Sequence, residues 1–396
     1  MATTQAPKVS AHPASPGQLA WLDRELASWV AGDLVTPETS AAIRGRYVAV
    51  RTFSLNRVLL NLGAVFVGVG LIWLVATNLD QFTPGVRFVV VTAIWLAVTA
   101  GAEFVADRRD GSPVVGALRG LASAGFGAVV FQAAQSLQVP AYEPSLIGYW
   151  AAGALLYSYA CRGVAPLLVG TATAATWFVW QIVETTESAS SAILALLVAG
   201  ALGSALAFLH TRPSFASVWR VAGSTLMLGG LFVAALPFVE ADELTWTLTL
   251  TATVVIATIA AGTAIVRSRG WERVEVLVPF LAVPVGVLLV IWNPPLPDHG
   301  VASGQAWVSA LVSVGVYVVA AGAVAVLGAL RDSPMLSALA TLALVIFTVT
   351  QSFAVFAPIV SGAALFLLLG VILIVTGILF DRVRREVTET IEEARS

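Results

Sequence analysis

Charge is scarce in this chain. Only 44 of its 396 residues are charged, 21 basic and 23 acidic, a share of 11% where soluble domains carry about 25%. Ten of these charges lie in residues 1–57 and nine in residues 381–396, so the long stretch between them is almost uncharged. With 58% hydrophobic residues and a mean hydropathy of +0.89, this distribution excludes a water-soluble globular fold. The sequence predicts an all-α, polytopic integral membrane helical bundle.

Lysine, cysteine and histidine are almost absent, and each absence excludes a class of site. Lys8 is the only lysine and the net charge is −2, so the basic surface of a nucleic-acid-binding protein is missing. Cys161 is the only cysteine and cannot form an intrachain disulfide. The histidines, His12, His210 and His299, have no metal-ligand spacing. We expect no nucleic-acid partner, no metal and no cofactor.

Signatures of catalysis and of nucleotide hydrolysis are also missing. No glycine-rich loop ends in Lys-Ser or Lys-Thr, and no histidine lies near a nucleophile in the sequence. We therefore expect no catalytic residue, and an ATP-driven pump is excluded for this chain alone. A pair of carboxylates at mid-membrane, typical of ion-coupled carriers, and the arginine repeat of a voltage sensor are equally absent.

Changes in composition divide the chain into four parts. Apolar residues recur at helical spacing from Leu19 to Val30, and Gly32 follows as a C-terminal cap. Thr36 is an N-cap with Pro37 at the first helical position, which begins a second helix. The predicted parts are a disordered lead-in (1–16), a small cytoplasmic helical hairpin (17–50), a transmembrane helical bundle (57–380) and a cytoplasmic helical tail (381–396).

Twelve apolar stretches are each long enough to cross a bilayer, which takes about 20 helical residues. The connections expected inside contain arginines such as Arg108, Arg162 and Arg331, whereas Arg87 is the only basic residue outside. The positive-inside rule then places both termini in the cytoplasm. The predicted spans are 57–77, 86–105, 114–137, 145–161, 164–183, 189–209, 216–238, 244–266, 272–292, 306–330, 335–357 and 359–380.

Small residues and tryptophans give further expectations. Gly116, Gly120 and Gly127 lie along the third span, which favours a central place for it in the bundle. Gly200 and Ser204 form a similar step in the sixth span. Most tryptophans, Trp150 among them, fall near predicted span ends, where an indole anchors a helix in the headgroup layer.

Three charged residues near the inner surface form a candidate inner gate or structural ion pair. Glu103 and Arg119 lie equally far from the turn at Gly111, so an antiparallel hairpin brings them level. Mutual neutralisation of two charges in lipid is the favoured explanation, and a gate or coupling pair is the alternative. Glu275 lies near Pro279, and a proline kink there is typical both of ordinary membrane helices and of broken transporter helices.

Neutral amides gather toward the predicted outer side. Gln132, Gln135 and Gln138 recur at three-residue steps, and Gln351 lies near the outer end of another span. Asn78 and Asp80 close the first outer turn. These six residues are a candidate ligand cleft: Asn78, Asp80, Gln132, Gln135, Gln138 and Gln351. Hydrogen bonds between helices that only fix packing are the alternative.

The hairpin and the first span resemble a known family. Trp29, Gly32, Pro37 and Tyr47 lead into a glycine-rich span that ends at Asn78, and a later span rich in Gly and Ala ends in Gln. This pattern is similar to a bacterial family of predicted membrane proteins, domain of unknown function 2157. The resemblance covers about the first 140 residues and implies a bacterial inner-membrane location without implying an activity.

The sequence thus leads to competing hypotheses about function. One is a transporter- or channel-like protein that handles a small polar solute through an outward-facing Gln-lined cleft. The second is a non-transporting membrane scaffold or sensor that recruits a cytoplasmic protein partner through residues 18–48 or 381–396. The third is a membrane enzyme acting on lipid-linked substrates, which would need clustered polar groups at one membrane surface. The lipid bilayer is a partner in all three.

Overall fold

A computed structural model describes residues 12–14, 16–49, 82–108, 112–140, 142–236, 239, 241–292 and 304–356, with isolated positions at 63, 66, 70, 370, 371, 374 and 382. The described chain divides into two units at Gly63. Apart from these isolated positions, the predicted spans 57–77 and 359–380, the lead-in up to residue 11 and the tail lie outside the described residues.

The first unit is a helical hairpin made of α1 (Pro16–Ala31) and α2 (Pro37–Gly45). Arg44 Nε donates to Asp23 Oδ1 at 2.6 Å and joins the two helices. Two short strands, β1 (His12–Ala14) and β2 (Tyr47–Ala49), pair in parallel beside them. This strand pair is an addition to a chain whose other described elements are all helices.

The caps of this hairpin follow from its sequence. Thr36 Oγ1 accepts from the Thr39 N–H at 3.2 Å and Pro37 begins α2, as predicted. At the end of α1, Leu34 N–H donates to the Trp29 carbonyl at 2.9 Å, which closes the helix terminus. The left-handed residue of this cap is Asp33, with φ of 56°, rather than Gly32. Aspartate tolerates this conformation better than most residues with a side chain.

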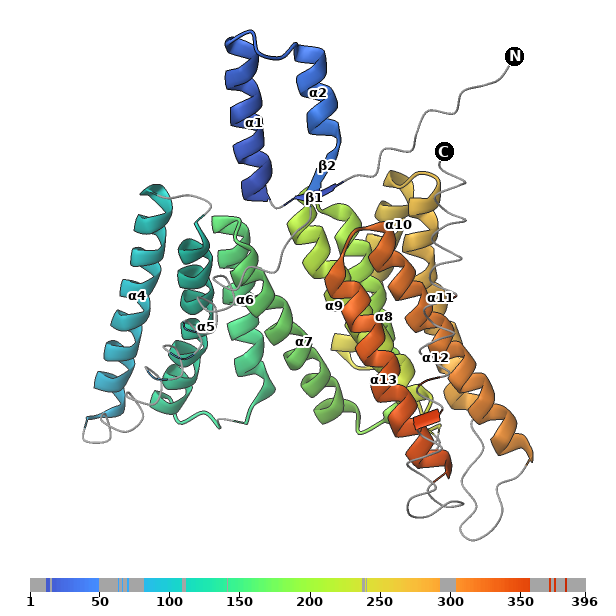
Figure 1. Cartoon of the computed structure of the whole chain (residues 1–396). Coiled ribbons are helices and arrows are strands. Elements are labelled where there is room, and N and C mark those ends of the chain that lie inside the picture. Colours follow the sequence, from blue (N-terminus) through green and yellow to red (C-terminus); the bar gives the residue numbers. More distant parts are fainter. Residues whose placement is uncertain are drawn as a thin grey trace, which may run out of the picture. The chain divides into compact units, whose positions relative to one another are not determined.

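The second unit contains ten long helices within its described residues. Consecutive helices run in opposite directions (Figure 1). They are α4 (Pro84–Arg108), α5 (Pro113–Ser136), α6 (Pro144–Cys161), α7 (Val164–Thr186), α8 (Ala189–Leu209), α9 (Pro213–Ala234), α10 (Leu248–Arg267), α11 (Trp271–Trp292), α12 (Gly304–Leu330) and α13 (Pro334–Phe356).

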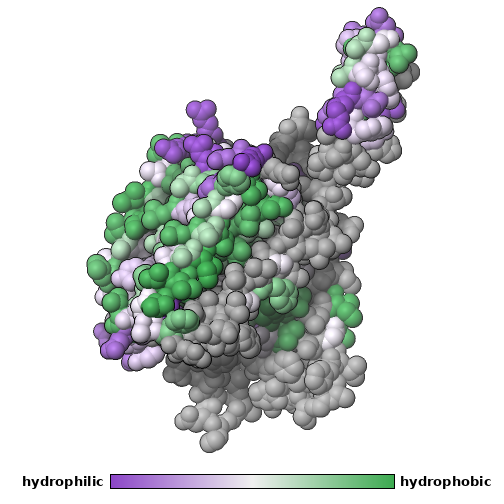
Figure 2. Space-filling model, turned by 90° about the vertical axis from the view of Figure 1, so that its left-hand side faces the viewer, coloured by the Kyte–Doolittle hydropathy of each residue, from purple (hydrophilic) through white to green (hydrophobic). Residues whose placement is uncertain are grey.

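These ten helices coincide with ten of the twelve predicted spans. Nine of them are long and apolar enough to cross a membrane, and the 18-residue α6 is not among these nine. Large apolar side chains such as Leu156, Ile259 and Val319 are exposed on the helices, as expected where lipid replaces water. Figure 2 shows hydrophobic residues between hydrophilic ends on the face that carries α4. The protein is a polytopic helical membrane protein.

Among the described helices the most buried is α8, and not α5 as the glycine pattern suggested. Twelve of the 21 residues of α8 are buried, against seven of the 24 residues of α5. The reason is a close crossing with α9, where Gly200 and Gly203 of α8 meet Gly223 of α9. A Cβ added to Gly223 would lie 2.7 Å from the Gly200 carbonyl oxygen. Small residues are common in every span, so their presence on α5 did not identify the centre.

Trp150 has a different role from the predicted anchor. Its Nε1 donates to the Ser123 carbonyl at 2.8 Å, near the middle of α5, and its ring covers Gly127. Trp95 of α4 donates in the same way to the neighbouring Ala122 carbonyl at 3.0 Å. The two indoles therefore hold α5 between α4 and α6, well inside the apolar layer. The indole of Trp150 needs an acceptor there because water is absent.

Candidate functional site

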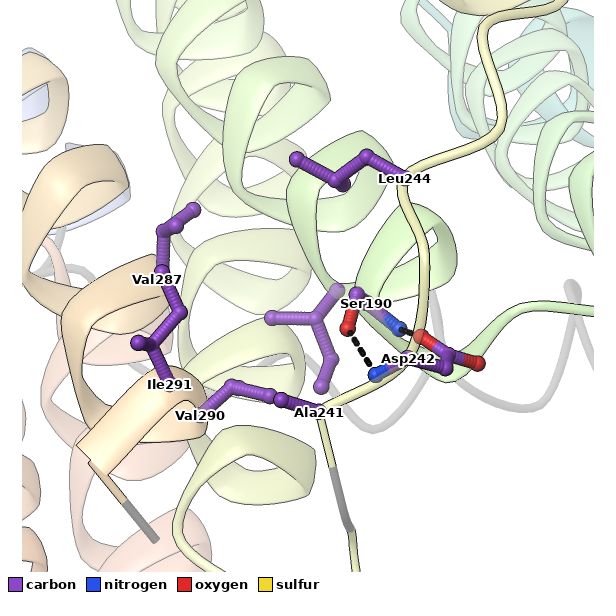
Figure 3. Close-up of a pocket in the computed structure, with 8 residues that line it drawn as sticks. Ser190, Ala241, Asp242, Leu244, Val287, Val290 and Ile291 are labelled. Atoms are coloured by element: carbon purple, nitrogen blue, oxygen red, sulfur yellow. Dashed lines mark hydrogen bonds between the residues drawn. The ribbon is translucent and has the colours of Figure 1, made fainter.

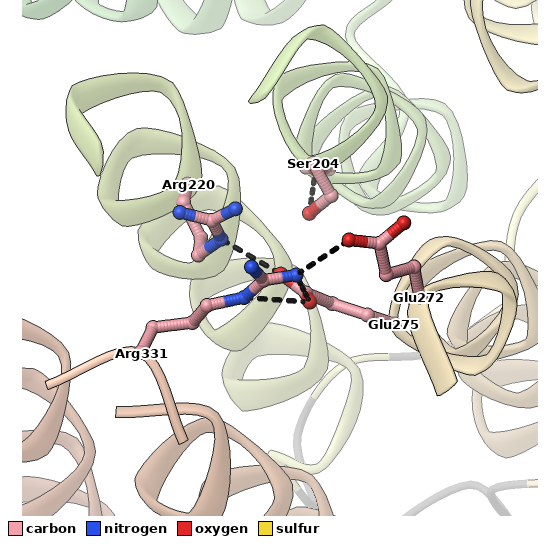
Figure 4. Close-up of polar contacts among 6 residues, drawn as sticks. Ser204, Arg220, Glu272, Glu275 and Arg331 are labelled. Atoms are coloured by element: carbon pink, nitrogen blue, oxygen red, sulfur yellow. Dashed lines mark hydrogen bonds and ion pairs between the residues drawn. The ribbon is translucent and has the colours of Figure 1, made fainter. Parts of the chain in front are cut away.

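A buried carboxylate on α11 is held by two arginines from other elements (Figure 4). Arg220 Nε of α9 donates to Glu275 Oε1 at 2.8 Å. Arg331, in the turn after α12, donates to Glu275 Oε2 from Nε at 3.0 Å and from Nη2 at 2.6 Å. We call Arg220, Glu275 and Arg331 the Glu275 clamp. It joins α9, α11 and the turn between α12 and α13.

Burial makes the Glu275 clamp electrostatically strong. The side chains of Glu275 and Arg220 are only 13% and 11% exposed. Both guanidinium groups also lie 5.8 Å from the centre of the Phe208 ring, which excludes water from one side. Glu272, one turn before Glu275, is 3.9 Å from Arg331 and far more exposed. The clamp therefore has two cations, one fully engaged carboxylate and a second carboxylate at its edge.

The α11 helix is continuous beside the Glu275 clamp. It runs from Trp271 to Trp292 through both Pro279 and Pro284. Glu275 therefore lies on an unbroken helix. The two arginine partners position this carboxylate, and a break in the helix does not.

A second ion pair links α4 and α5, as the positions of Glu103 and Arg119 predict. Arg119 Nε donates to Glu103 Oε1 at 2.9 Å and Nη2 donates to Oε2 at 2.5 Å, a two-point contact. The Tyr157 hydroxyl of α6 also donates to Glu103 Oε1, at 2.5 Å. The carboxylate of Glu103 thus ties three helices together. Sequence reasoning missed Tyr157, because nothing in its spacing relates it to Glu103.

A third polar contact lies at the same end of the unit, between α6, α8 and α9. Trp219 Nε1 donates to the Tyr159 oxygen at 3.1 Å, and Tyr159 lies 2.8 Å from His210 Nε2. His210 Nδ1 lies 2.7 Å from the Leu206 carbonyl, an acceptor, so Nδ1 carries a hydrogen. In the neutral imidazole, Nε2 then accepts from the Tyr159 hydroxyl.

These three contacts gather at one end of the helices. Their residues lie within a few turns of the connections that contain Arg108, Arg162, Arg212, Arg267 and Arg331. Figure 1 places those connections at the upper end of the second unit. The arginine-rich end is therefore joined by charged and polar contacts between helices.

The candidate glutamines are divided between two groups of helices. Gln132 is half-buried, and Gln135 and Gln138 are exposed near the end of α5, which packs against α4, α6 and α7. Gln351 is buried on α13, which packs against α9 and α12. Asn78 and Asp80 lie outside the described residues. The structure therefore does not bring all six cleft residues together.

An apolar pocket lies at the opposite end from the arginines (Figure 3). It has a volume of about 150 Å³ and lies between the start of α8, the 241–244 loop and the end of α11. Its lining residues are Ser190, Ile193, Ala241, Asp242, Leu244, Val287, Val290 and Ile291. Such a lining offers few hydrogen bonds to a polar solute.

Asp242 fixes the loop beside this pocket to the N-terminus of α8. Its carboxylate accepts from Ala189 N–H at 2.7 Å, from Ser190 N–H at 2.9 Å and from the Ser188 hydroxyl at 2.9 Å. Burial by itself raises the pKa of Asp242, but hydrogen bonds from Ser190, Ala189 and Ser188 outweigh it and lower the pKa to about 2. Asp242 is ionised at neutral pH and acts as a structural cap.

Metal-ligating residues do not cluster in the part of the chain that the structure describes: no three His, Cys, Asp or Glu residues come together there. The cysteine, Cys161, is half-buried at the end of α6 and is a free thiol. The arrangement therefore offers hydrogen bonds and ion pairs as its chemistry.

Part of the chain is similar to a known family of proteins. Residues 27–167 match the family DUF2157, described as predicted membrane protein. The matched region runs from the C-terminal part of α1 to the first turn of α7 and contains Glu103, Arg119, Tyr157 and Gln132. The Glu275 clamp and Gln351 lie beyond it. No curated protein and no solved structure matches the chain.

Proposed function

We propose that this membrane protein conducts a small polar solute across the bilayer, in the manner of a transporter or channel, and that its ion pairs are the closed inner gate. The main support for this proposal is the Glu275 clamp, which joins α9, α11 and the turn after α12 through one buried carboxylate. A contact shared by three elements at one end of a bundle closes that end. Release of the carboxylate would free all three elements together.

Two further features support this proposal. Glu103, Arg119 and Tyr157 make an equivalent three-helix contact at the same end. Charges kept inside a membrane are costly, so they are found where they pair or line a pathway. We infer from the positive-inside rule that this end faces the cytoplasm of a bacterial inner membrane.

The polar groups toward the opposite end suit a neutral or weakly polar solute. Gln132 and Gln135 lie about four turns from Arg119 along α5, near the predicted outer side. Gln351 lies near the corresponding end of α13. Amide side chains offer both donors and acceptors without a charge. In this proposal Gln132 and Gln135 line the outward-facing entry, whereas Gln351 lies apart from them on α13.

Solute flux in proteoliposomes tests the proposal. Stopped-flow light scattering follows the swelling of vesicles that contain the full chain, with urea, acetamide, glycerol and amino acids as solutes. We expect faster swelling than in empty vesicles for at least one solute. We expect Glu275→Gln to increase that rate, because it weakens the closed gate, and Gln132→Leu to decrease it. Glu272→Gln is the matched control. Vesicles that behave like empty ones across the panel, for the full chain and for Glu275→Gln, would exclude conduction.

A second candidate function is recruitment of a cytoplasmic protein by the hairpin. It is favoured by the hairpin forming a unit of its own and by the exposure of Trp21 and Leu34, which are 53% and 75% accessible. Exposed large apolar residues on a small polar hairpin are typical of a binding face. In this hypothesis the spans anchor a scaffold or sensor.

Removal of residues 1–48 separates the two functions. Conduction predicts that vesicles with the truncated chain keep the solute flux of the full chain. Recruitment predicts that neither form shows flux and that the full chain retains a cytoplasmic protein in membrane extracts while the truncated chain does not.

A further inference from the structure

Gln351 is a buried amide without hydrogen-bond partners. Its side chain is 5% exposed on α13, and neither Oε1 nor Nε2 has a partner among the described residues. An amide in an apolar interior that leaves its donors and acceptor unused costs free energy. Nearly all buried polar groups in folded proteins avoid this cost. Gln351 therefore indicates a partner that is not one of the described side chains.

Two buried residues that carry hydroxyl groups lie near Gln351 in the register of α12 and α13. Thr348 lies one turn before it on α13, and Ser313 lies on the facing side of α12; both are buried. Neither hydroxyl forms a hydrogen bond with a described residue. Thr341 of the same helix α13 donates to the Ser337 carbonyl at 2.9 Å, which is the usual way for a helical threonine to satisfy its hydroxyl. The hydroxyl of Thr348 is not used in this way.

The register of α12 and α13 brings these groups to one level. The helices are joined by a short turn between Leu330 and Pro334, so they run antiparallel. Tyr317 and Phe347 stack with ring centres 3.9 Å apart, which fixes which residues face each other. Ser313 lies four residues before Tyr317, and Gln351 lies four residues after Phe347. Both are therefore about one turn from the stacked rings, on the same side of them.

The aromatic side chains give this place a rigid inner boundary. Phe232 of α9 contacts both Tyr317 and Phe347 edge to face, with ring centres 6.2 Å and 5.9 Å away. The Tyr317 hydroxyl is satisfied by the Ala343 carbonyl at 3.4 Å. No charged residue occurs in the α12 or α13 sequences. A partner for Gln351 therefore meets neutral hydrogen-bonding groups on one side and aromatic rings on the other.

We propose that Gln351, Thr348 and Ser313 form a binding subsite for a small neutral solute that carries a hydrogen-bond donor and an acceptor on neighbouring atoms, as a primary amide or urea does. The Gln351 amide presents its acceptor and donor side by side, so it pairs with such a group through two hydrogen bonds. Neither α12 nor α13 contributes a charge that would compensate that of an ion, which favours a neutral solute. This inference rests on the proposed conduction of a polar solute and names the class of that solute.

Acetamide binding to the purified full chain in detergent tests the subsite. The thermal unfolding midpoint is measured against acetamide concentration for the wild type, Gln351→Leu and Thr348→Val. We expect a saturable rise in the midpoint for the wild type, apparent affinity at least tenfold weaker for Gln351→Leu, and about threefold weaker for Thr348→Val. Thr341→Val is the matched control, because Thr341 lies on the same helix and its hydroxyl is already satisfied by the Ser337 carbonyl. Its affinity should equal that of the wild type.

A second ligand and a second readout keep the outcomes distinct. N,N-dimethylacetamide has no N–H donor, so we expect no saturable effect from it. The subsite is rejected if acetamide gives no saturable shift in the wild type, which is the result expected if only water occupies the place. It is also rejected if Gln351→Leu binds acetamide as the wild type does. Acetamide binding that depends on Gln351 but occurs without flux in vesicles would reject conduction alone. Flux without such binding would reject the subsite alone.

Discussion

Glu275→Gln is the substitution that tests the Glu275 clamp most sharply. Glutamine has nearly the same shape as glutamate but no charge, so the variant removes the anion and leaves Arg220 and Arg331 in place. The Arg220 side chain is only 11% exposed, so its charge stays largely desolvated. Loss of one partner from a buried ion pair typically costs 3–5 kcal/mol, because the other charge remains desolvated. We expect a loss of about 3 kcal/mol, since the glutamine oxygen still accepts one hydrogen bond.

Glu272→Gln is the matched control for this substitution. Glu272 is on the same helix, one turn away, and it also faces Arg331. Its ion pair is longer, at 3.9 Å, and its side chain is 49% exposed. Exposed pairs contribute less than about 1 kcal/mol, so we expect a change below that value. The two variants thus differ in burial and geometry while they remove the same charge.

The free energies of unfolding of Glu275→Gln and Glu272→Gln are measured by reversible unfolding in mixed micelles. The micelles are titrated with dodecyl sulfate, and unfolding is followed by far-ultraviolet circular dichroism. Arg220→Gln combined with Glu275→Gln should recover part of the loss, because no buried unpaired cation then remains on α9. Equal effects of Glu275→Gln and Glu272→Gln, or strict additivity in the Arg220 and Glu275 cycle, would refute a desolvated clamp.

Three other predictions concern packing, capping and the interior tryptophan. Gly223→Ala should destabilise the protein by about 1–3 kcal/mol, because its Cβ would lie 2.7 Å from the Gly200 oxygen. Gly229 is on the same helix and has open space around it, so Gly229→Ala should be neutral or stabilising in the same unfolding titration. For Asp242, whose pKa is lowered to about 2 in the fold, the stabilisation is present above the unfolded pKa near 3.9 and is lost as pH falls toward 2. Between pH 4 and pH 2 the midpoint of thermal unfolding should therefore fall more in the wild type than in Asp242→Asn. An equal fall in both would contradict the cap. The difference in the free energy of unfolding should stay below about 1 kcal/mol, because Asp242 is exposed. Trp150→Phe removes the hydrogen bond to the Ser123 carbonyl and should lower the free energy of unfolding by about 1 kcal/mol. The Trp246 side chain is exposed, so Trp246→Phe should have almost no effect. Equal effects would indicate that Trp150 acts as an interfacial anchor instead.

The sequence was most informative where a local rule applies. Span length and hydropathy located the described membrane helices, and Thr36 and Pro37 began α2 because capping depends on neighbouring residues. Glu103 and Arg119 were predicted to meet because a single turn separates their helices, so symmetry about that turn determines which residues are level.

Contacts between distant parts of the chain were not predictable in the same way. Arg220 and Arg331 lie 55 and 56 positions from Glu275, and no periodicity relates them. Trp150 satisfied the rule for interfacial anchors, but its indole reaches a mid-span carbonyl because Gly127 leaves room for the ring. Glycine and alanine occur in every span, so composition did not reveal that α8 is the most buried of the described helices.

The glutamines illustrate the same limit for the candidate site. Their three-residue spacing predicted that Gln132, Gln135 and Gln138 share a face of one helix, but α5 ends at Ser136 and Gln138 follows it with a left-handed φ of 58°. Spacing alone does not reveal which face is buried, and Gln135 is exposed in the structure. Gln351 has no other glutamine at helical spacing from it, yet among these four glutamines it is the one that is buried. Burial depends on the packing of α12 and α13, which is a property of the folded chain.

The sidedness of the membrane is the claim on which the gate, the entry and the cytoplasmic hairpin all depend. Because Cys161 is the only cysteine, Cys161→Ser gives a background in which single cysteines replace Arg269, in the turn before α11, or Glu243, in the loop before α10. A membrane-impermeant maleimide is applied to intact cells and to permeabilised cells. We predict that the cysteine at 243 is labelled in intact cells and that the cysteine at 269 is labelled only after permeabilisation. Labelling at 269 in intact cells, or the same pattern at both positions, would contradict the account.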